Sequence, residues 1–213
     1  MKNKLLLLFF LLGVFFPLSA QESEVLISTS HTSLLLSTSQ GGELKFLYYG
    51  RKLTDADVHA IVSTESGSFS AYPVYGLNCP SESALSVQHE DGNMTLQMEV
   101  IGVETTHQEK ANLTVISLKD KVYPFYVKLC YKAYQDVDVI EAWTEISHKE
   151  KKNVKLNQFA SAYLPVRKGN VWLSSLYGAW ANEARLVQEP LEPGMKVIKN
   201  KDGVRNSHTA HAE

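Results

Sequence analysis

Apolar residues recur at every second position through much of this chain from Val25 onward. The three clearest runs are Leu44, Phe46 and Tyr48; Met94, Leu96, Met98 and Val100; and Tyr123, Phe125, Val127, Leu129 and Tyr131. Side chains of a β-strand point alternately to its two faces, so this period of two predicts half-buried strands, with one face in a core and one in water. A chain with this pattern folds into sheets and not into a helical bundle.

Short clusters of glycine, asparagine, aspartate and charged residues separate the apolar runs. They lie at residues 40–42, 90–93, 119–121, 135–136, 148–153, 167–170 and 201–203. This spacing is typical of antiparallel hairpins. We expect about ten to fourteen strands, too many for one flat sheet, so the predicted fold class is all-β: a large two-sheet antiparallel β-sandwich with few helices. One short helical turn is expected over residues 55–62, where Val58, Ile61 and Val62 share a side.

The size and charge of the chain exclude several classes of function. It has 213 residues, of which 21 are basic and 23 acidic, and a formal net charge of −2. That length suits one domain with a targeting segment and is short of the about 250 residues of a (β/α)8 barrel. Proteins that bind nucleic acid carry clustered lysines and arginines, and the sequence has no such block. Nucleic acid is therefore not an expected partner.

The first twenty residues differ in composition from the rest. Lys2 and Lys4 precede an almost purely apolar run over residues 5–16, and Ala20 is followed by polar residues. This layout is that of a secretory signal peptide, because the apolar run of about 12 residues is shorter than the about 20 that span a bilayer. We expect residues 1–20 to be a signal peptide and residues 21–213 to be an exported domain. Its expected location is periplasmic or extracellular, with no membrane attachment after cleavage.

Few groups of the remaining sequence are typical of metal or catalytic centres. Cys79 and Cys130 are the two cysteines, and in an exported protein they either form one disulfide or stay as buried thiols. His208 and His211 have no third ligand nearby, so neither a metal site nor a cofactor is expected. The sequence lacks the motifs of nucleophilic hydrolases, phosphate-binding loops and zinc proteases. The charged run over residues 148–152 is interpreted as a solvated turn.

Two pairs of aspartates are candidates for work on sugars, because glycoside hydrolysis needs only two carboxyl groups, about 5 to 9.5 Å apart. Asp55 and Asp57 form one pair, and Asp136 and Asp138 form the other. Acids two residues apart are common in exposed turns, so neither pair is predicted to be a catalytic dyad.

Several segments, read in order, are similar to one family. They are FLYYGRKL at 46–53, AYPVYG at 71–76, DVDVI at 136–140 with Trp143 beyond it, SA at 161–162, LYGAWANE at 176–183 and GVRNSH at 203–208. This series resembles the N-terminal domain of the glycoside hydrolase family 36 α-galactosidases, or melibiases, over essentially all of residues 21–213. The resemblance implies a β-supersandwich that precedes a catalytic (β/α)8 barrel. It also implies a retaining enzyme that hydrolyses terminal α-galactosides such as melibiose and raffinose-type sugars.

The resemblance further implies where the chemistry lies. In the family, the nucleophile and the acid/base are aspartates of the barrel on motifs such as Lys-Trp-Asp, whereas Trp143, Trp172 and Trp180 are followed here by Thr, Leu and Ala. We therefore expect this chain to end before the barrel, to hold no catalytic residue and to be inactive alone.

A loop of the N-terminal domain is implied to bring an acid to the mouth of a barrel, often across an oligomer interface. The implied counterparts are Asp57 and Asp55, as substrate-binding residues. The implied partners are the barrel, α-galactoside sugars and further copies of the intact enzyme. The alternative is a stand-alone exported module that binds carbohydrate or another protein without catalysis.

Overall fold

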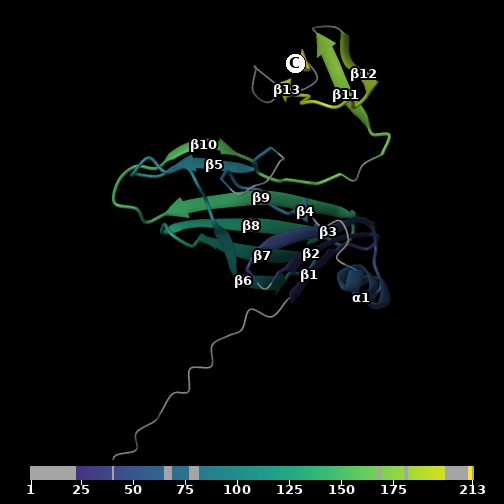
Figure 1. Ribbon diagram of the computed structural model, residues 1–213. Helices are drawn as coiled ribbons and strands as arrows, with labels where there is room; N and C mark the ends of the chain where they lie inside the picture. Colours follow the sequence, from purple (N-terminus) through teal and green to yellow (C-terminus); the bar gives the residue numbers. More distant parts are fainter. Residues whose placement is uncertain are drawn as a thin grey trace, which may run out of the picture. The chain divides into compact units, whose positions relative to one another are not determined.

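The computed structural model describes residues 23–39, 41–64, 69–76, 82–166, 169–179, 182–199 and 211–212. These residues form fourteen strands and one α-helix, which confirms the predicted all-β class (Figure 1). Contacts between residues divide the chain into two compact units, Met1–Pro165 and Val166–Glu213. No helix among the described residues is long and apolar enough to cross a membrane.

Two four-stranded antiparallel sheets make up most of the first unit. One has the order β1 (Ser23–Ser28), β2 (Thr32–Thr38), β3 (Leu44–Arg51) and β4 (Phe69–Ser70). The other has the order β6 (Met98–His107), β7 (Ala111–Asp120), β8 (Phe125–Tyr134) and β9 (Val139–His148). In both sheets each strand pairs with the next along the chain. The β2–β3, β7–β8 and β8–β9 connections fall at predicted turn clusters, whereas α1 (Asp55–Thr64) lies between β3 and β4.

Three two-stranded ladders complete the fold. In the first unit, β5 (Leu85–Gln88) pairs with β10 (Lys155–Phe159), and a bulge lies between Leu156 and Gln158. In the second unit, β11 (Trp172–Ala179) pairs with β12 (Asn182–Pro190), and β13 (Ile198–Lys199) pairs with β14 (His211–Ala212).

One apolar core joins the two large sheets and β5. Most of its buried members come from alternate positions of the strands: Val25 and Ile27; Leu34 and Leu36; Leu44 and Phe46; Leu85 and Val87; Ile116 and Leu118; and Phe125, Val127 and Leu129. Burying each such side chain contributes about 1.5 to 3 kcal/mol. The period of two in the sequence therefore marks the inward faces of a sandwich.

The second face of β3 differs from the sequence-based expectation of a wet surface. Leu35 pairs with Tyr48 and Leu36 with Phe46, so Leu47 lies in a bulge between them. Leu47 is buried in a second cluster with Leu35 and with Val58 of α1 (Asp55–Thr64). The helix, predicted over residues 55–62, thus covers this part of the outer face of β3. The prediction that this face is exposed to water is therefore wrong here.

One expected strand begins later than its alternation suggests. Met94 and Leu96 precede β6, which begins at Met98. The backbone of this stretch forms its hydrogen bonds elsewhere, since the N–H of Leu96 donates to the carbonyl of Tyr75 at 3.1 Å and the N–H of Gln97 to Asp120 at 2.6 Å. Leu96 is nevertheless fully buried. In this stretch the apolar alternation therefore marks a buried segment, but not a strand that pairs with a neighbouring strand.

The two cysteines have different outcomes. Cys130 is a buried free thiol on β8, and burial raises its pKa, with the nearby carboxylate of Glu145 acting in the same direction. Cys79 lies outside the described residues.

Candidate functional site

Asp57 caps the helix α1. Thr54 is the N-cap residue, because its carbonyl accepts the N–H of Val58 at 3.0 Å. Oδ2 of Asp57 accepts the backbone N–H of Thr54 at 2.9 Å and its hydroxyl at 2.7 Å, and the N–H of Asp57 donates back to Oγ1 of Thr54 at 3.3 Å. This reciprocal arrangement is a capping box. The bond from the Thr54 hydroxyl is the main cause of the lowered pKa of Asp57, and Arg51 contributes to it.

Asp55 occupies the first turn of the same helix. Its side chain is exposed, and it has no hydrogen-bond or ion-pair partner within the described ranges. A carboxylate in this position is favoured by the partial positive charge of the helix N-terminus. Both oxygens of Asp55 can therefore accept bonds from a ligand, whereas one oxygen of Asp57 already holds the cap.

Three hydrogen bonds fix the segment that leads into α1. The N–H of Lys52 donates to the carbonyl of His31 at 2.6 Å, and its Nζ donates to the carbonyl of Thr29 at 2.9 Å. The N–H of Leu53 donates to Oγ of Ser33 at 3.1 Å. The start of the helix is thus attached by hydrogen bonds to the turn between β1 and β2 and to β2 itself.

The other aspartate pair does not form a site. Asp138 accepts bonds from the hydroxyls of Thr29 and Thr32 and from the N–H of His31, so it ties the β8–β9 turn to the β1–β2 turn. These bonds, led by that of Thr29, lower the pKa of Asp138. Asp138 has a positive φ of 53°, a conformation that aspartate tolerates better than most residues. Its role is to hold the two turns together.

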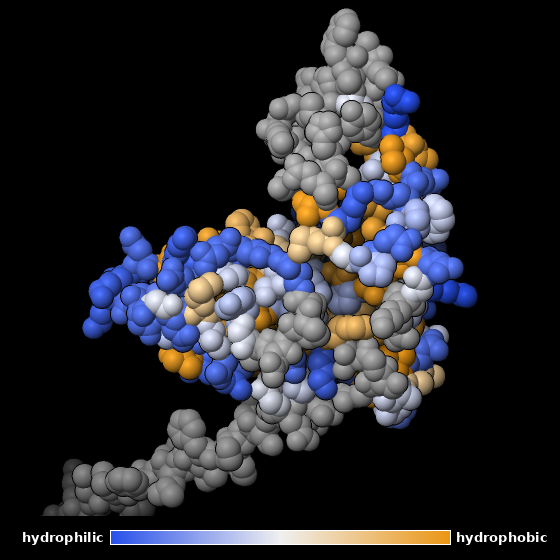
Figure 2. Space-filling view, turned by 45° about the horizontal axis from the view of Figure 1, so that its top comes forward, coloured by the Kyte–Doolittle hydropathy of each residue, from blue (hydrophilic) through white to orange (hydrophobic). Residues whose placement is uncertain are grey.

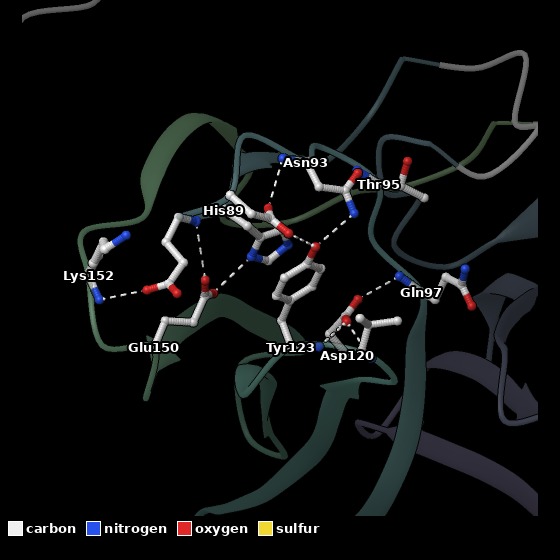
Figure 3. A network of polar contacts seen from close by, with 11 residues as sticks. His89, Asn93, Thr95, Gln97, Asp120, Tyr123, Glu150 and Lys152 are labelled. Carbon is white, nitrogen blue, oxygen red and sulfur yellow. Dashed lines mark hydrogen bonds and ion pairs between the residues drawn. The ribbon is translucent and has the colours of Figure 1, made fainter.

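A second group of polar side chains lies at the other end of the sandwich, where the sequence predicts no site (Figure 3). His89 follows β5 and is 3% exposed. Its ring stacks on that of Tyr123, with centroids 3.7 Å apart, and meets the edge of Phe125 at 5.9 Å. Nδ1 of His89 lies 2.8 Å from Oε1 of Glu150, whose side chain is 3% exposed. His89 and Glu150 thus share a short hydrogen bond in the interior.

The same group extends through Tyr123 to Asp91. The Tyr123 hydroxyl donates to Oδ2 of Asp91 at 2.7 Å and accepts a bond from the side-chain amide of Asn93 at 3.0 Å (Figure 3). The bond to Asp91 raises the pKa of Tyr123, and the same bond lowers the pKa of Asp91. The network joins the loop after β5, the β7–β8 turn and the loop after β9.

Asp120 completes the polar interior of this end. It is 1% exposed at the last position of β7. Oδ2 accepts the N–H of Gln97 at 2.6 Å, and Oδ1 accepts the N–H groups of Val122 and Tyr123, each at 2.8 Å. One carboxylate thus satisfies three backbone donors that have no strand partner.

Some of these buried polar residues follow a signal that the sequence contains. His89 continues the alternation of Leu85 and Val87, and Asp120 continues that of Ile116 and Leu118. The interpretation of residues 148–152 as a solvated turn is wrong for Glu150, because its carboxylate is buried against a histidine 61 residues away in sequence. No local pattern contains that contact.

The described residues contain no group of three or more His, Cys, Asp or Glu that could hold a metal ion. His208 and Trp180 lie outside the described ranges, as do parts of the segments on which the resemblance rests. Thr95 joins the network of His89, Tyr123 and Glu150 through its backbone N–H, which donates to Oδ1 of Asn93 at 3.1 Å (Figure 3). The network therefore holds the three loops that contribute to it together.

Comparison with known proteins identifies the family. The family model of the glycosyl hydrolase family 36 N-terminal domain matches residues 42–212. The α-galactosidase Mel36A of Lactobacillus acidophilus is 29% identical over 104 residues, which are 49% of this chain and 14% of that protein. The chain therefore spans a small part of the length of this relative.

Solved structures show the same fold. The α-galactosidase of Lactobacillus brevis superposes with a TM-score of 0.72 and 19% identity, over 86% of this chain and 29% of that chain. A variant of the α-galactosidase AgaA from Geobacillus stearothermophilus, in complex with raffinose, superposes with a TM-score of 0.72 and 21% identity, over 84% of this chain and 30% of that chain. The family model matches residues 42–212, and the sandwich has the fold of the N-terminal part of these enzymes. The chain therefore belongs to the N-terminal domains of glycoside hydrolase family 36.

Proposed function

We propose that this chain is the N-terminal, non-catalytic β-sandwich portion of an exported α-galactosidase that hydrolyses terminal α-galactosides such as melibiose and raffinose-type sugars. The observation that carries the proposal is the coverage: 84% of this chain superposes on 30% of an α-galactosidase solved with raffinose. The chemistry then belongs to the catalytic aspartates of a (β/α)8 barrel outside this chain. The sandwich supports that barrel and completes its active site.

Within this proposal, Asp55 and Asp57 are the residues that reach the sugar. The two carboxylates stand on the exposed first turn of α1, and three hydrogen bonds hold the lead-in to that helix. A carboxylate accepts two hydroxyl groups at once and so fixes the orientation of a sugar. Asp55 is the better of the two, because the Thr54 cap already occupies one oxygen of Asp57.

The β11–β12 hairpin supplies an apolar surface for the catalytic portion. In the register of the hairpin, Trp172 lies opposite Pro190 and Leu176 opposite Leu186. Trp172 and Leu186 are each 61% exposed, and Leu176 is 51% exposed. Figure 2 shows one face of the molecule, on which hydrophobic residues come to the surface in patches between hydrophilic ones. A two-stranded sheet cannot cover its own apolar face, so this face favours a partner domain of the same enzyme.

The coding DNA beyond the Glu213 codon provides the direct test. We expect a reading frame, in phase or shifted, that encodes a (β/α)8 barrel with the two catalytic aspartates. If the transcript encodes no such barrel in any frame, the proposal fails.

A kinetic test addresses the two aspartates in the enzyme that contains this domain. Asp55→Ala should raise KM for raffinose several-fold with little change in kcat, since uniform substrate binding is lost. Asp136→Ala, which removes an exposed acid from the β8–β9 turn, is the matched control and should leave both constants unchanged. Equal constants for Asp55→Ala, Asp57→Asn and the parent enzyme would remove both residues from the substrate site.

Export and assembly are further parts of the proposal. Cleavage of the predicted leader would leave Gln21 as the first residue, and N-terminal sequencing of the protein recovered from the periplasm or medium tests this. In the intact enzyme we expect a homo-oligomer, measurable by light scattering. The alternative, a stand-alone exported module for carbohydrate or protein binding, gains support if the transcript lacks a barrel and the protein is still exported.

A further inference from the structure

One face of the second large sheet points away from the shared core. Phe125, Val127 and Leu129 of β8 are buried in the core, so the residues between them face outward. On β9, Ile140 and Ile146 pack against the same core. The outward residues of β8 and β9 are called the β8–β9 outer face below.

Three aromatic side chains are spaced along the β8–β9 outer face. Trp143 lies at its centre, opposite Cys130. Tyr126 and Tyr134 lie at its two ends on β8, eight residues apart, which corresponds to about 27 Å at the rise of an antiparallel strand. All three rings are partly exposed, and none belongs to the apolar core.

Charged side chains occupy the positions between the aromatic rings. Lys128 lies opposite Glu145 on one side of Trp143, and Lys132 lies opposite Glu141 on the other. Although they face each other across the strands, none of these four side chains forms an ion pair within the described part of the chain. Each lysine and glutamate therefore keeps hydrogen-bonding capacity for a ligand.

The aromatic residues also orient the carboxylates. Nε1 of Trp143 donates to Oε1 of Glu145 at 3.3 Å, and the hydroxyl of Tyr134 donates to Oε2 of Glu141 at 3.0 Å. Only one oxygen of each glutamate is bonded in this way. Nζ of Lys132 lies over the Tyr134 ring, 5.0 Å from its centre, and Nζ of Lys149 lies over the Tyr126 ring, 5.7 Å from its centre, so each terminal ring already contacts one ammonium group.

This order of ring, charged pair, ring, charged pair and ring matches the chemistry of a neutral sugar chain. The C–H faces of sugars pack on aromatic rings, and their hydroxyls bond to carboxylates and ammonium groups. The two opposed Lys–Glu pairs cancel, and Lys149 over the Tyr126 ring adds a single positive charge, so the face has only a weak general attraction for a polyanion such as nucleic acid. We propose that the β8–β9 outer face binds a linear, neutral polysaccharide along the direction of the strands. This site requires neither a barrel nor Asp55.

Affinity electrophoresis of the full chain tests the proposal. The chain should be retarded in native gels that contain galactomannan or another neutral polysaccharide, and not in gels that contain polygalacturonate or heparin. Trp143→Ala should weaken binding about tenfold, which corresponds to the loss of about 1.4 kcal/mol of aromatic contact. Trp143→Phe keeps a ring and should stay within about threefold. Tyr49→Ala, which removes a 50% exposed aromatic ring from β3, is the control and should change nothing.

A second variant covers the case in which Trp143→Ala unfolds, which circular dichroism would reveal. Glu141→Ala changes an exposed residue and should weaken binding several-fold with an unchanged spectrum. Migration unaffected by any neutral polysaccharide overturns the proposal. So does retardation that Trp143→Ala and Glu141→Ala leave intact, or retardation by polyanions alone. Because the assay uses the chain without a barrel, its result is independent of whether the chain is part of an α-galactosidase.

Discussion

Removing the carboxylate of Asp120 should destabilise the sandwich strongly, because this one group accepts three backbone hydrogen bonds from two separate segments. It is 1% exposed and accepts three backbone N–H groups, from Gln97, Val122 and Tyr123, at 2.6 to 2.8 Å. An N–H group that loses its partner in the interior costs about 1 to 3 kcal/mol. Asp120→Ala strips all three, so we expect a loss of about 3 to 5 kcal/mol in the free energy of unfolding.

Asp120→Asn separates the hydrogen bonds from the charge. The amide oxygen can keep the bonds to Val122 and Tyr123, while the amide nitrogen faces the N–H of Gln97, and the expected loss is about 1 to 2 kcal/mol. Urea unfolding followed by circular dichroism, with linear extrapolation at a common m-value, measures both. Asp136→Ala, an exposed acid, is the control and should lie within about 0.5 kcal/mol of the parent. A loss below about 1 kcal/mol for Asp120→Ala, or equal losses for Ala and Asn, would show that these three bonds do not carry the stability assigned to them.

Three further changes probe other parts of the structure. Gly76→Ala should lower the free energy of unfolding, measured in urea, by more than Gly92→Ala does. Both glycines have positive φ, at 95° and 88°, but a Cβ at residue 76 would lie 2.7 Å from Cα of Thr95, whereas a Cβ at residue 92 would have nothing within 4 Å. Thr54→Ala should lose about 1 kcal/mol by removing the cap of α1, and an unchanged midpoint of unfolding would contradict the capping box. Burial raises the pKa of Tyr131 to about 12, so the folded state favours the neutral phenol. The contribution of this residue to the free energy of unfolding should therefore be fully present below about pH 10 and should be lost as the pH rises to about 12. Tyr131→Phe should flatten that fall in alkaline unfolding curves.

The strands could be predicted from sequence because alternation is a local property of an extended chain. Phe125, Val127 and Leu129 are buried on one side of β8 as their spacing requires. The helix α1 also had a local signal, since Val58, Ile61 and Val62 share a side. The bulge at Leu47 had none, because it depends on the helix that packs over it.

The polar interior was harder to predict because its partners come from distant segments. Lys119, Asp120 and Lys121 have the composition of an exposed turn, yet Asp120 alone faces inward at the end of β7. Glu150 stands in a run of charged residues, and its partner His89 is 61 residues away in the chain. The pattern of a single sequence shows which residues alternate between the two faces of a strand, but it does not show which two loops come into contact.

The candidate residues Asp55 and Asp57 came from the resemblance to a family, and the structure shows the hydrogen bonds that each of them forms. Thr54 and Asp57 have the spacing of a capping box, which explains an acid at residue 57 without a ligand. No such bond accounts for Asp55 within the described residues. The distinction between the two acids therefore depends on coordinates and could not be drawn from the sequence.

The central proposal, that the catalytic aspartates lie on a barrel outside this chain, predicts that the chain performs no hydrolysis by itself. Incubating the purified chain with a chromogenic substrate such as p-nitrophenyl α-galactoside measures this in one step. We predict no turnover above the buffer background at any pH at which the sandwich is folded. Measurable turnover that Asp57→Ala abolishes would contradict the proposal that the chemistry lies outside this chain.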